Sequence, residues 1–137
     1  KMKPFNIKVF TPKGKILDKS SVFLNIPGEI GDIGVYDDHT PSLVKLKIGS
    51  VKLTTANQSH HYFIPSGMAH ITEEEVTILT SYLEPVEDID KKRATEAKER
   101  AEGRLSLDEK DIDSSRAKDS LQRAETRLKL YLAHRSN

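Results

Sequence analysis

Proline, glycine and arginine are divided unevenly along this 137-residue chain, and that division constrains its fold more than any other feature. All six prolines and six of the seven glycines occur before residue 88, and the last proline is Pro85. All seven arginines occur later, between Arg93 and Arg135. Because proline and glycine interrupt helices and favour turns, the first part should be rich in turns and the second part helical. The sequence therefore predicts two domains, residues 1–87 and 88–137.

Bulk composition argues against several classes of protein. The formal net charge is only +1, and in residues 88–137 the 13 basic residues are balanced by 11 acidic ones, so nothing favours nucleic-acid binding. The absence of cysteine excludes disulfides and thiolate chemistry. No stretch approaches the roughly 20 apolar residues that cross a bilayer, and the start shows no signal-peptide pattern. We therefore expect a soluble chain whose contact with a membrane would be peripheral.

Short alternating apolar runs, separated by turn residues, predict β-strands in the first domain. In the first run Phe5, Ile7 and Val9 share one face, and a turn at residues 11–14 ends the run. Gly49-Ser50 separates two later runs at the spacing of a tight hairpin. Many short strands at roughly 8–12-residue spacing favour a sandwich or a barrel, because a single open sheet would leave long edges unpaired.

Three segments of the first domain invite a chemical interpretation. The glycine-rich run at residues 28–34 fits no phosphate-binding motif and lacks a following helix, so a turn or bulge is the better interpretation. Asp37-Asp38-His39 is more typical of a turn than of a metal site. His60-His61 would point to opposite faces of a strand. We therefore expect no metal site and no catalytic residue.

The second domain has helical periodicity. Asp88 or Glu87 suits the start of a first helix that ends near Gly103, and a second helix should begin near Asp108 or Asp111. A short turn between them predicts an antiparallel two-helix hairpin. Its apolar seam would be narrow and rich in alanine, and so weakly stabilised at about 25 cal/mol per Å² of buried apolar surface. The seam residues are Ala94, Ala97, Ala101 and Leu105 on the first helix and Ala117, Leu121, Ala124, Leu128 and Tyr131 on the second.

The arginines of the hairpin fall on shared faces. Arg93 and Arg100 are seven residues apart, Arg104 lies one turn further, and Arg123 and Arg127 are an i, i+4 pair. An antiparallel hairpin would bring Arg93 close to Arg123 and Arg127, an arrangement suited to a polyphosphate. The alternative is that these arginines are solvated or paired with acids of the same helices, namely Glu96, Glu99 or Glu125.

With both parts considered, the chain resembles the epsilon subunit of bacterial F-type ATP synthases along nearly its whole length. In the first part the resemblance lies in the turn Thr11-Pro12-x-Gly14, in Gly31-Asp32-Ile33-Gly34-Val35-x-x-x-His39-x-Pro41, and in the run Val76–Leu79. In the second part Ile89-Asp90-x-x-Arg93-Ala94 matches a motif associated with ATP binding in some members. Two positions depart from the family pattern: Asp38 replaces a glycine, and residues 66–69 replace a glycine-glycine-aromatic turn.

The resemblance implies a β-sandwich of about ten short strands followed by the two-helix hairpin. It implies a non-catalytic rotor subunit of the proton-translocating synthase, at the cytoplasmic face of the bacterial plasma membrane. The sandwich would contact the gamma subunit and the c-ring. The hairpin, extended towards the α/β hexamer and the acidic surface of β, would inhibit ATP hydrolysis; the folded hairpin would release that inhibition.

The resemblance also implies that the folded hairpin binds ATP as a regulatory ligand, with no other cofactor required. The residues implied in this site are Glu84, Ile89, Asp90, Arg93, Ala94, Arg100, Arg123 and Arg127. Two alternatives stay open: a subunit that inhibits by conformation without useful ATP binding, and a generic helical-hairpin interaction module on a β carrier domain.

Overall fold

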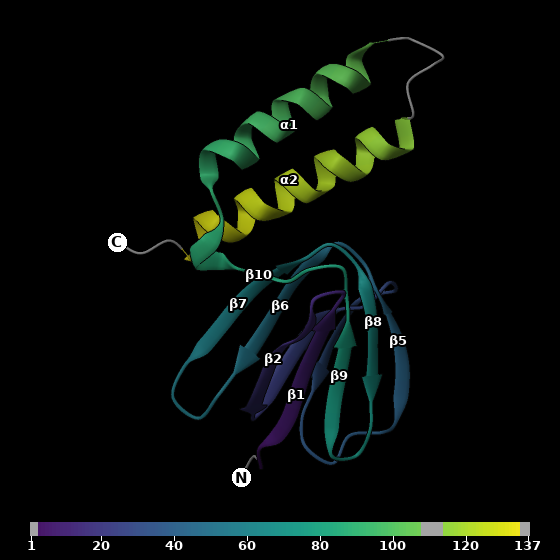
Figure 1. The fold of residues 1–137 in the computed structure, drawn as a ribbon, viewed down its shortest axis with the longest axis vertical. Helices are drawn as coiled ribbons and strands as arrows, with labels where there is room; N and C mark the ends of the chain where they lie inside the picture. Colours follow the sequence, from purple (N-terminus) through teal and green to yellow (C-terminus); the bar gives the residue numbers. More distant parts are fainter. Residues whose placement is uncertain (1–2, 108–113, 135–137) are drawn as a thin grey trace. The chain divides into compact units, whose positions relative to one another are not determined.

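The computed structural model describes residues 3–107 and 114–134, and the chain divides into two compact units, Lys1–Glu84 and Pro85–Asn137 (Figure 1). The described residues contain ten short strands and two α-helices, with a 3₁₀ turn between them. The strands are β1 Phe5–Thr11, β2 Gly14–Ser21, β3 Phe23–Pro27, β4 Asp32–Val35, β5 Ser42–Leu46, β6 Gly49–Thr54, β7 Ser59–Ile64, β8 Gly67–Ile71, β9 Glu75–Leu79 and β10 Glu84–Pro85.

The strands form two five-stranded sheets, in the orders β2-β1-β9-β8-β5 and β10-β7-β6-β3-β4. β1 and β9 pair in parallel, whereas β1–β2, β3–β4, β3–β6, β5–β8, β6–β7 and β8–β9 pair antiparallel. Phe5, Ile7 and Val9 are buried while the residues between them are half-buried, which is the predicted alternation. Side chains from both sheets share this core. The predicted β-sandwich is therefore confirmed.

The predicted hairpin at Gly49-Ser50 is wrong. β5 pairs with β8 in one sheet, whereas β6 begins at Gly49 and pairs with β7 and β3 in the other. The chain thus crosses between sheets, and Leu46 and Val51 are both buried in the shared core. Gly49 is needed for a close approach instead, because an added Cβ would lie 2.6 Å from the Cβ of Pro27. Local spacing cannot specify which strand is the partner.

The turn predicted at residues 28–34 is shorter than expected, because Asp32–Val35 form β4, while residues 37–38 form a turn as predicted. Residues 28–31 connect β3 to β4, which pair as an antiparallel hairpin. Asp38 has a φ of 57°, in the left-handed region that favours glycine. That conformation explains why glycine is the usual residue there in the family that the sequence resembles, and aspartate is among the residues that tolerate it.

The second unit is a helical hairpin in which four of the predicted seam alanines are buried, together with Leu130, which was not predicted. η1 covers Val86–Asp88, α1 covers Lys91–Ser106, and α2 covers Ser114–His134; α1 and α2 run side by side (Figure 1). α1 begins and ends later than predicted, because Asp90 caps it and Gly103 lies inside it. The expected start of the second helix at Asp108 or Asp111 falls outside the described residues. The buried helix residues are Ala94, Ala101, Ala117, Ala124 and Leu130.

Candidate anion-binding site

A hollow of about 310 Å³ is lined by both helices of the hairpin. Four of the seven described residues that line it are arginines, and none of the seven is acidic or aromatic. The lining residues are Ala97, Arg100, Ala101 and Arg104 from α1 and Ser120, Arg123 and Arg127 from α2. Since the guanidinium group is a planar donor that matches phosphate and carboxylate oxygens, this hollow is suited to an anion.

Helical spacing explains how these side chains gather. One face of α1 carries the lining residues 97, 100, 101 and 104, because residues three or four apart in a helix share a face. The same spacing places residues 120, 123 and 127 on one face of α2. The small Ala101 is buried at 2% exposure, as befits the alanine-lined seam. The hollow consequently exists only while α1 and α2 are side by side.

Two of the four arginines that line the hollow have no ion pair within the described residues. Within the described part of the chain, Arg100 and Arg104 have no ion pair, so pairing with Glu96, Glu99 or Glu125 does not occupy them. Arg123 donates from Nη2 to the Ser120 hydroxyl at 3.1 Å. A bound anion would offer acceptor oxygens to the N–H donors of these arginines.

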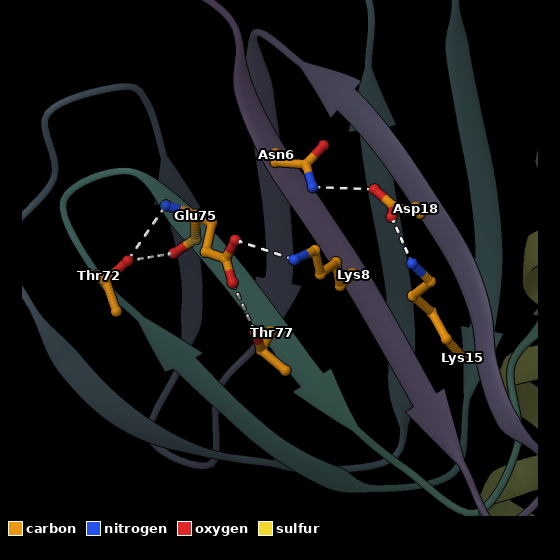
Figure 2. Close-up of polar contacts among 7 residues, drawn as sticks. All are labelled: Asn6, Lys8, Lys15, Asp18, Thr72, Glu75 and Thr77. Carbon is orange, nitrogen blue, oxygen red and sulfur yellow. Dashed lines mark hydrogen bonds and ion pairs between the residues drawn. The ribbon is translucent and has the colours of Figure 1, made fainter.

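Several polar groups of the sandwich satisfy one another. On the outer face of one sheet, Lys15 Nζ lies 2.8 Å from Asp18, Asn6 donates to Asp18 at 2.9 Å, and Lys8 pairs with Glu75 at 3.3 Å (Figure 2). The hydrogen bond from Lys15, followed by that from Asn6, lowers the pKa of the Asp18 carboxyl. These groups need no ligand.

The start of α1 holds the motif residues of the second domain. Asp90 is the N-cap, and its carboxylate accepts a hydrogen bond from the backbone N–H of Arg93 at 3.1 Å. Ile89 and Ala94 are buried at 6% and 4% exposure, whereas Arg93 is exposed. The conformation of this segment therefore gives Asp90, Ile89 and Ala94 structural roles that need no ligand.

The structure brings together three of the eight residues predicted for the ATP site, Arg100, Arg123 and Arg127. Ile89, Asp90, Arg93 and Ala94 do not line the hollow and lie at the start of α1, while Glu84 ends the first unit in β10. Sequence reasoning left Arg104 and Ser120 out of the site. Arg104 lies four residues after Arg100, and Ser120 lies three residues before Arg123. Residues at these spacings share a helix face, so the sequence contained a signal for both.

Known families account for both units. A family model described as the β-sandwich domain of the ATP synthase delta/epsilon chain matches residues 4–86, and one described as its long α-helix domain matches residues 87–131. The chain belongs to the ATP synthase delta/epsilon family. Members of this family are subunits of the synthase and not its catalytic subunits, so the expectation of a non-catalytic subunit is confirmed.

Bacterial relatives of this delta/epsilon family member are similar over most of its length. The ATP synthase epsilon chain of Bacillus velezensis is 38% identical over 105 residues, covering 77% of this chain and 80% of the relative. The epsilon chain of Bacillus subtilis is 36% identical over the same number of residues and the same shares. That of Desulfitobacterium hafniense strain Y51 is 36% identical over 102 residues, or 74% and 77%.

Solved structures share the fold. A chain in the mitochondrial ATP synthase of Euglena gracilis, in a structure of OSCP, F1 and c-ring, superposes with a TM-score of 0.84 at 20% identity. The match covers 96% of this chain and 82% of that one. A chain in the central stalk and c-ring of the Tetrahymena thermophila enzyme gives a TM-score of 0.56 at 15% identity, covering 97% of each.

Proposed function

We propose that this chain is a central-stalk subunit of an F-type, proton-translocating ATP synthase, and that its hairpin regulates ATP hydrolysis by binding ATP when α1 and α2 lie side by side. Four arginines around one hollow carry the ATP-binding part of this proposal. Because the hollow needs both helices, a ligand there has higher affinity for the folded hairpin than for an extended one. It therefore shifts the population towards the folded form.

The expected consequence is a switch. Without ATP the alanine seam holds the two helices together only weakly, so the hairpin can extend, and the extended hairpin inhibits hydrolysis by reaching the α/β hexamer and the acidic surface of β. With ATP the folded hairpin is held and inhibition is released.

A titration of the full chain with ATP tests this proposal. Arg123→Ala and Arg127→Ala should each weaken ATP binding about tenfold or more, because a hydrogen bond to a charged group contributes about 1.5–3 kcal/mol. Lys118→Ala removes a positive charge from an exposed position of α2 that does not line the hollow, and should leave affinity unchanged. Equal affinities in all three variants, or no binding by the wild type at millimolar ATP, would contradict ATP sensing.

One observation favours a second candidate, a subunit that inhibits by conformation without useful ATP binding. Asp90, the acidic residue of the motif, already has a partner in the Arg93 N–H. The same titration separates the two: a wild type that inhibits hydrolysis in the assembled complex but binds no ATP supports the second candidate.

The sandwich supplies the surface for the stalk partners. Ile30 is fully exposed, Leu43 is 67% exposed, and both line a hollow of about 500 Å³. Uncovered aliphatic groups on a folded domain fit a partner interface, here with the gamma subunit and the c-ring. No helix in the described part of the chain is long and apolar enough to cross a bilayer. The chain would therefore reach the cytoplasmic face of the bacterial membrane through these partners.

Assembly measurements test this surface. Ile30→Asp should reduce co-purification of the chain with gamma and the c-ring, whereas Ile16→Asp changes a less exposed isoleucine of β2 and should not. An equal loss in both variants would argue against a specific contact at Ile30.

A further inference from the structure

The two ends of the helical hairpin are built from different side chains. The proximal end consists of η1, the start of α1 and the last turns of α2, that is, residues 86–97 and 124–134. The distal end consists of the last turns of α1 and the first turns of α2, residues 101–107 and 114–121 (Figure 1). α2 contacts η1 as well as α1, so the antiparallel arrangement brings the end of α2 to the start of the unit.

Larger buried side chains stabilise the proximal end. Val86, Ile89 and Leu130 are 7%, 6% and 6% exposed. Asp90 caps α1 at this end by accepting a hydrogen bond from the backbone N–H of Arg93 at 3.1 Å. Because a branched aliphatic side chain removes more apolar surface from water than alanine does, the helices resist separation most strongly here.

The distal end has a much smaller apolar interface. Its buried side chains in the described residues are Ala101 and Ala117, and its half-buried aliphatic side chains are Leu105 and Leu121. A buried methyl group removes little apolar surface from water, so the contact between α1 and α2 is weakest at this end.

Gly103 weakens the helix in the same place. It lies inside α1, and an added Cβ would meet nothing within 4 Å, so no close approach requires a glycine there. Glycine in a helix interior costs stability because it loses more backbone freedom than other residues on folding. The Ser106 hydroxyl donates to the Gly103 carbonyl at 2.8 Å, and the Leu107 N–H donates to the Arg104 carbonyl at 3.3 Å, a bond typical of a tightened last turn.

We propose that the hairpin opens from its distal end, with the helical turns around Gly103 unwinding first while Val86, Ile89 and Leu130 keep the proximal end closed. The inference concerns the order of opening in the free chain, and it does not depend on a ligand. Its consequence for regulation rests on the proposed function: the separation of α1 from α2 would begin at the end remote from η1. A measurement without nucleotide therefore tests it independently of ATP sensing.

Hydrogen exchange of the full chain, followed amide by amide by NMR in the absence of nucleotide, measures the order of opening. After correction for intrinsic rates, the amides of Leu105, Ser106 and Leu121 should exchange about tenfold or more faster than those of Ala97 and Leu130. Equal protection at the two ends would overturn the inference, and so would faster exchange at the proximal end.

A pair of alanine variants in α1 tests the role of Gly103. Gly103→Ala should slow exchange at Leu105, Ser106 and Leu121 together by about two- to fivefold, the factor that matches the helix penalty of glycine. Thr95→Ala also raises helix propensity, but in the proximal half of α1, and should leave these three amides unchanged. Equal slowing by both variants would mean that α1 opens as a whole. Slowing confined to α1 would mean that α1 frays alone. Either result, or no slowing by Gly103→Ala, overturns the inference.

A pair of leucine variants in α2 tests the proximal end. Leu130→Ala removes a buried side chain and should speed exchange at Ala97 by about tenfold or more, because the cavity weakens the contact that keeps this end closed. Leu132→Ala removes the same atoms from a side chain that is 49% exposed, and should change exchange at Ala97 by less than about twofold. Complete loss of protection in both helices of Leu130→Ala would also support the inference. Wild-type protection of Ala97 in Leu130→Ala, or equal effects of the two variants, would overturn it.

Discussion

At the residue scale, single side chains decide where the hairpin begins and which charges stay unpaired. Asp90 fixes the first turn of α1 by capping it, although the family motif suggests a ligand contact for the same carboxylate. On the sandwich, Asp18 is held by Lys15 and Asn6 and is fully satisfied (Figure 2).

Asp90→Ala should destabilise the hairpin by about 1 kcal/mol, because the helix loses its N-cap. Hydrogen exchange of the first-turn amides of α1 measures the effect. Asp90→Ser retains a capping hydroxyl and removes the charge, so it should keep the protection of the wild type. If Asp90→Ser nevertheless lowers ATP affinity, the carboxylate is a ligand contact; equal protection in all three proteins would contradict the capping role.

The Asp18 carboxyl should titrate below the ordinary aspartate pKa of about 3.9. Its lowered pKa means that the folded state favours the carboxylate, so the contribution to stability is present above pH ~4 and is lost as pH falls through the lowered pKa. Carboxyl chemical shifts followed by NMR measure this. In Lys15→Ala the pKa of Asp18 should rise towards its ordinary value; a midpoint unaffected by the loss of Lys15 would show that the hydrogen bond is not its cause.

At the scale of elements, the two units depend on different kinds of packing. The strands pack through close backbone approaches and a shared apolar core, and the helices pack through buried alanines. The same substitution therefore has opposite consequences in the two units.

Gly67→Ala should destabilise the sandwich, and Gly103→Ala should stabilise the hairpin. Gly67 has a φ of 157°, and a Cβ there would lie 2.3 Å from the backbone oxygen of Leu79. Gly103 lies within α1 with nothing within 4 Å of an added Cβ, so alanine gains about 0.5–1 kcal/mol of helix stability. Denaturant unfolding of both variants measures the direction of each change in the free energy of unfolding. Destabilisation by Gly103→Ala would contradict an open environment at that position.

Ala101→Leu should open the hairpin. Ala101 is 2% exposed, and forcing a larger side chain into a packed seam typically costs about 1–3 kcal/mol. Faster hydrogen exchange in both helices, together with weaker ATP binding, is the expected result. Ala133→Leu adds the same atoms at an exposed position of α2 and should change neither; equal effects of the two variants would show that the seam is not closely packed.

At the scale of the whole molecule, the proposed regulation requires the two units to differ in stability. The core residues of the sandwich belong to the first unit, so that unit contains what it needs to fold. The hairpin has a thinner seam, in which the buried residues of the two helices are four alanines and one leucine. A difference in stability between units is what a mobile regulatory element requires.

Deletion of residues 88–137 should leave a sandwich that unfolds cooperatively within a few degrees of the full chain and does not bind ATP. Calorimetry and an ATP titration of the truncated chain measure both. Loss of cooperative unfolding would show that the sandwich depends on the hairpin, and retained ATP binding would place the ligand outside the hairpin.

The sequence by itself determined the two-part organisation, the inward faces of the strands and the alanine seam. These features follow from local rules. Proline and glycine interrupt regular elements, successive side chains of a strand point to opposite faces, and side chains three or four residues apart share a helix face. The same periodicity grouped Arg123 with Arg127 on one face of the second helix.

Only the tertiary structure decided the pairing of β5 and β6 with different sheets, the capping role of Asp90 and the inclusion of Arg104 and Ser120 in the hollow. Strand partners depend on burial against distant residues, which local spacing does not encode. The register of one helix on the other is likewise set by how the alanines pack, and that register determines which arginines share a hollow.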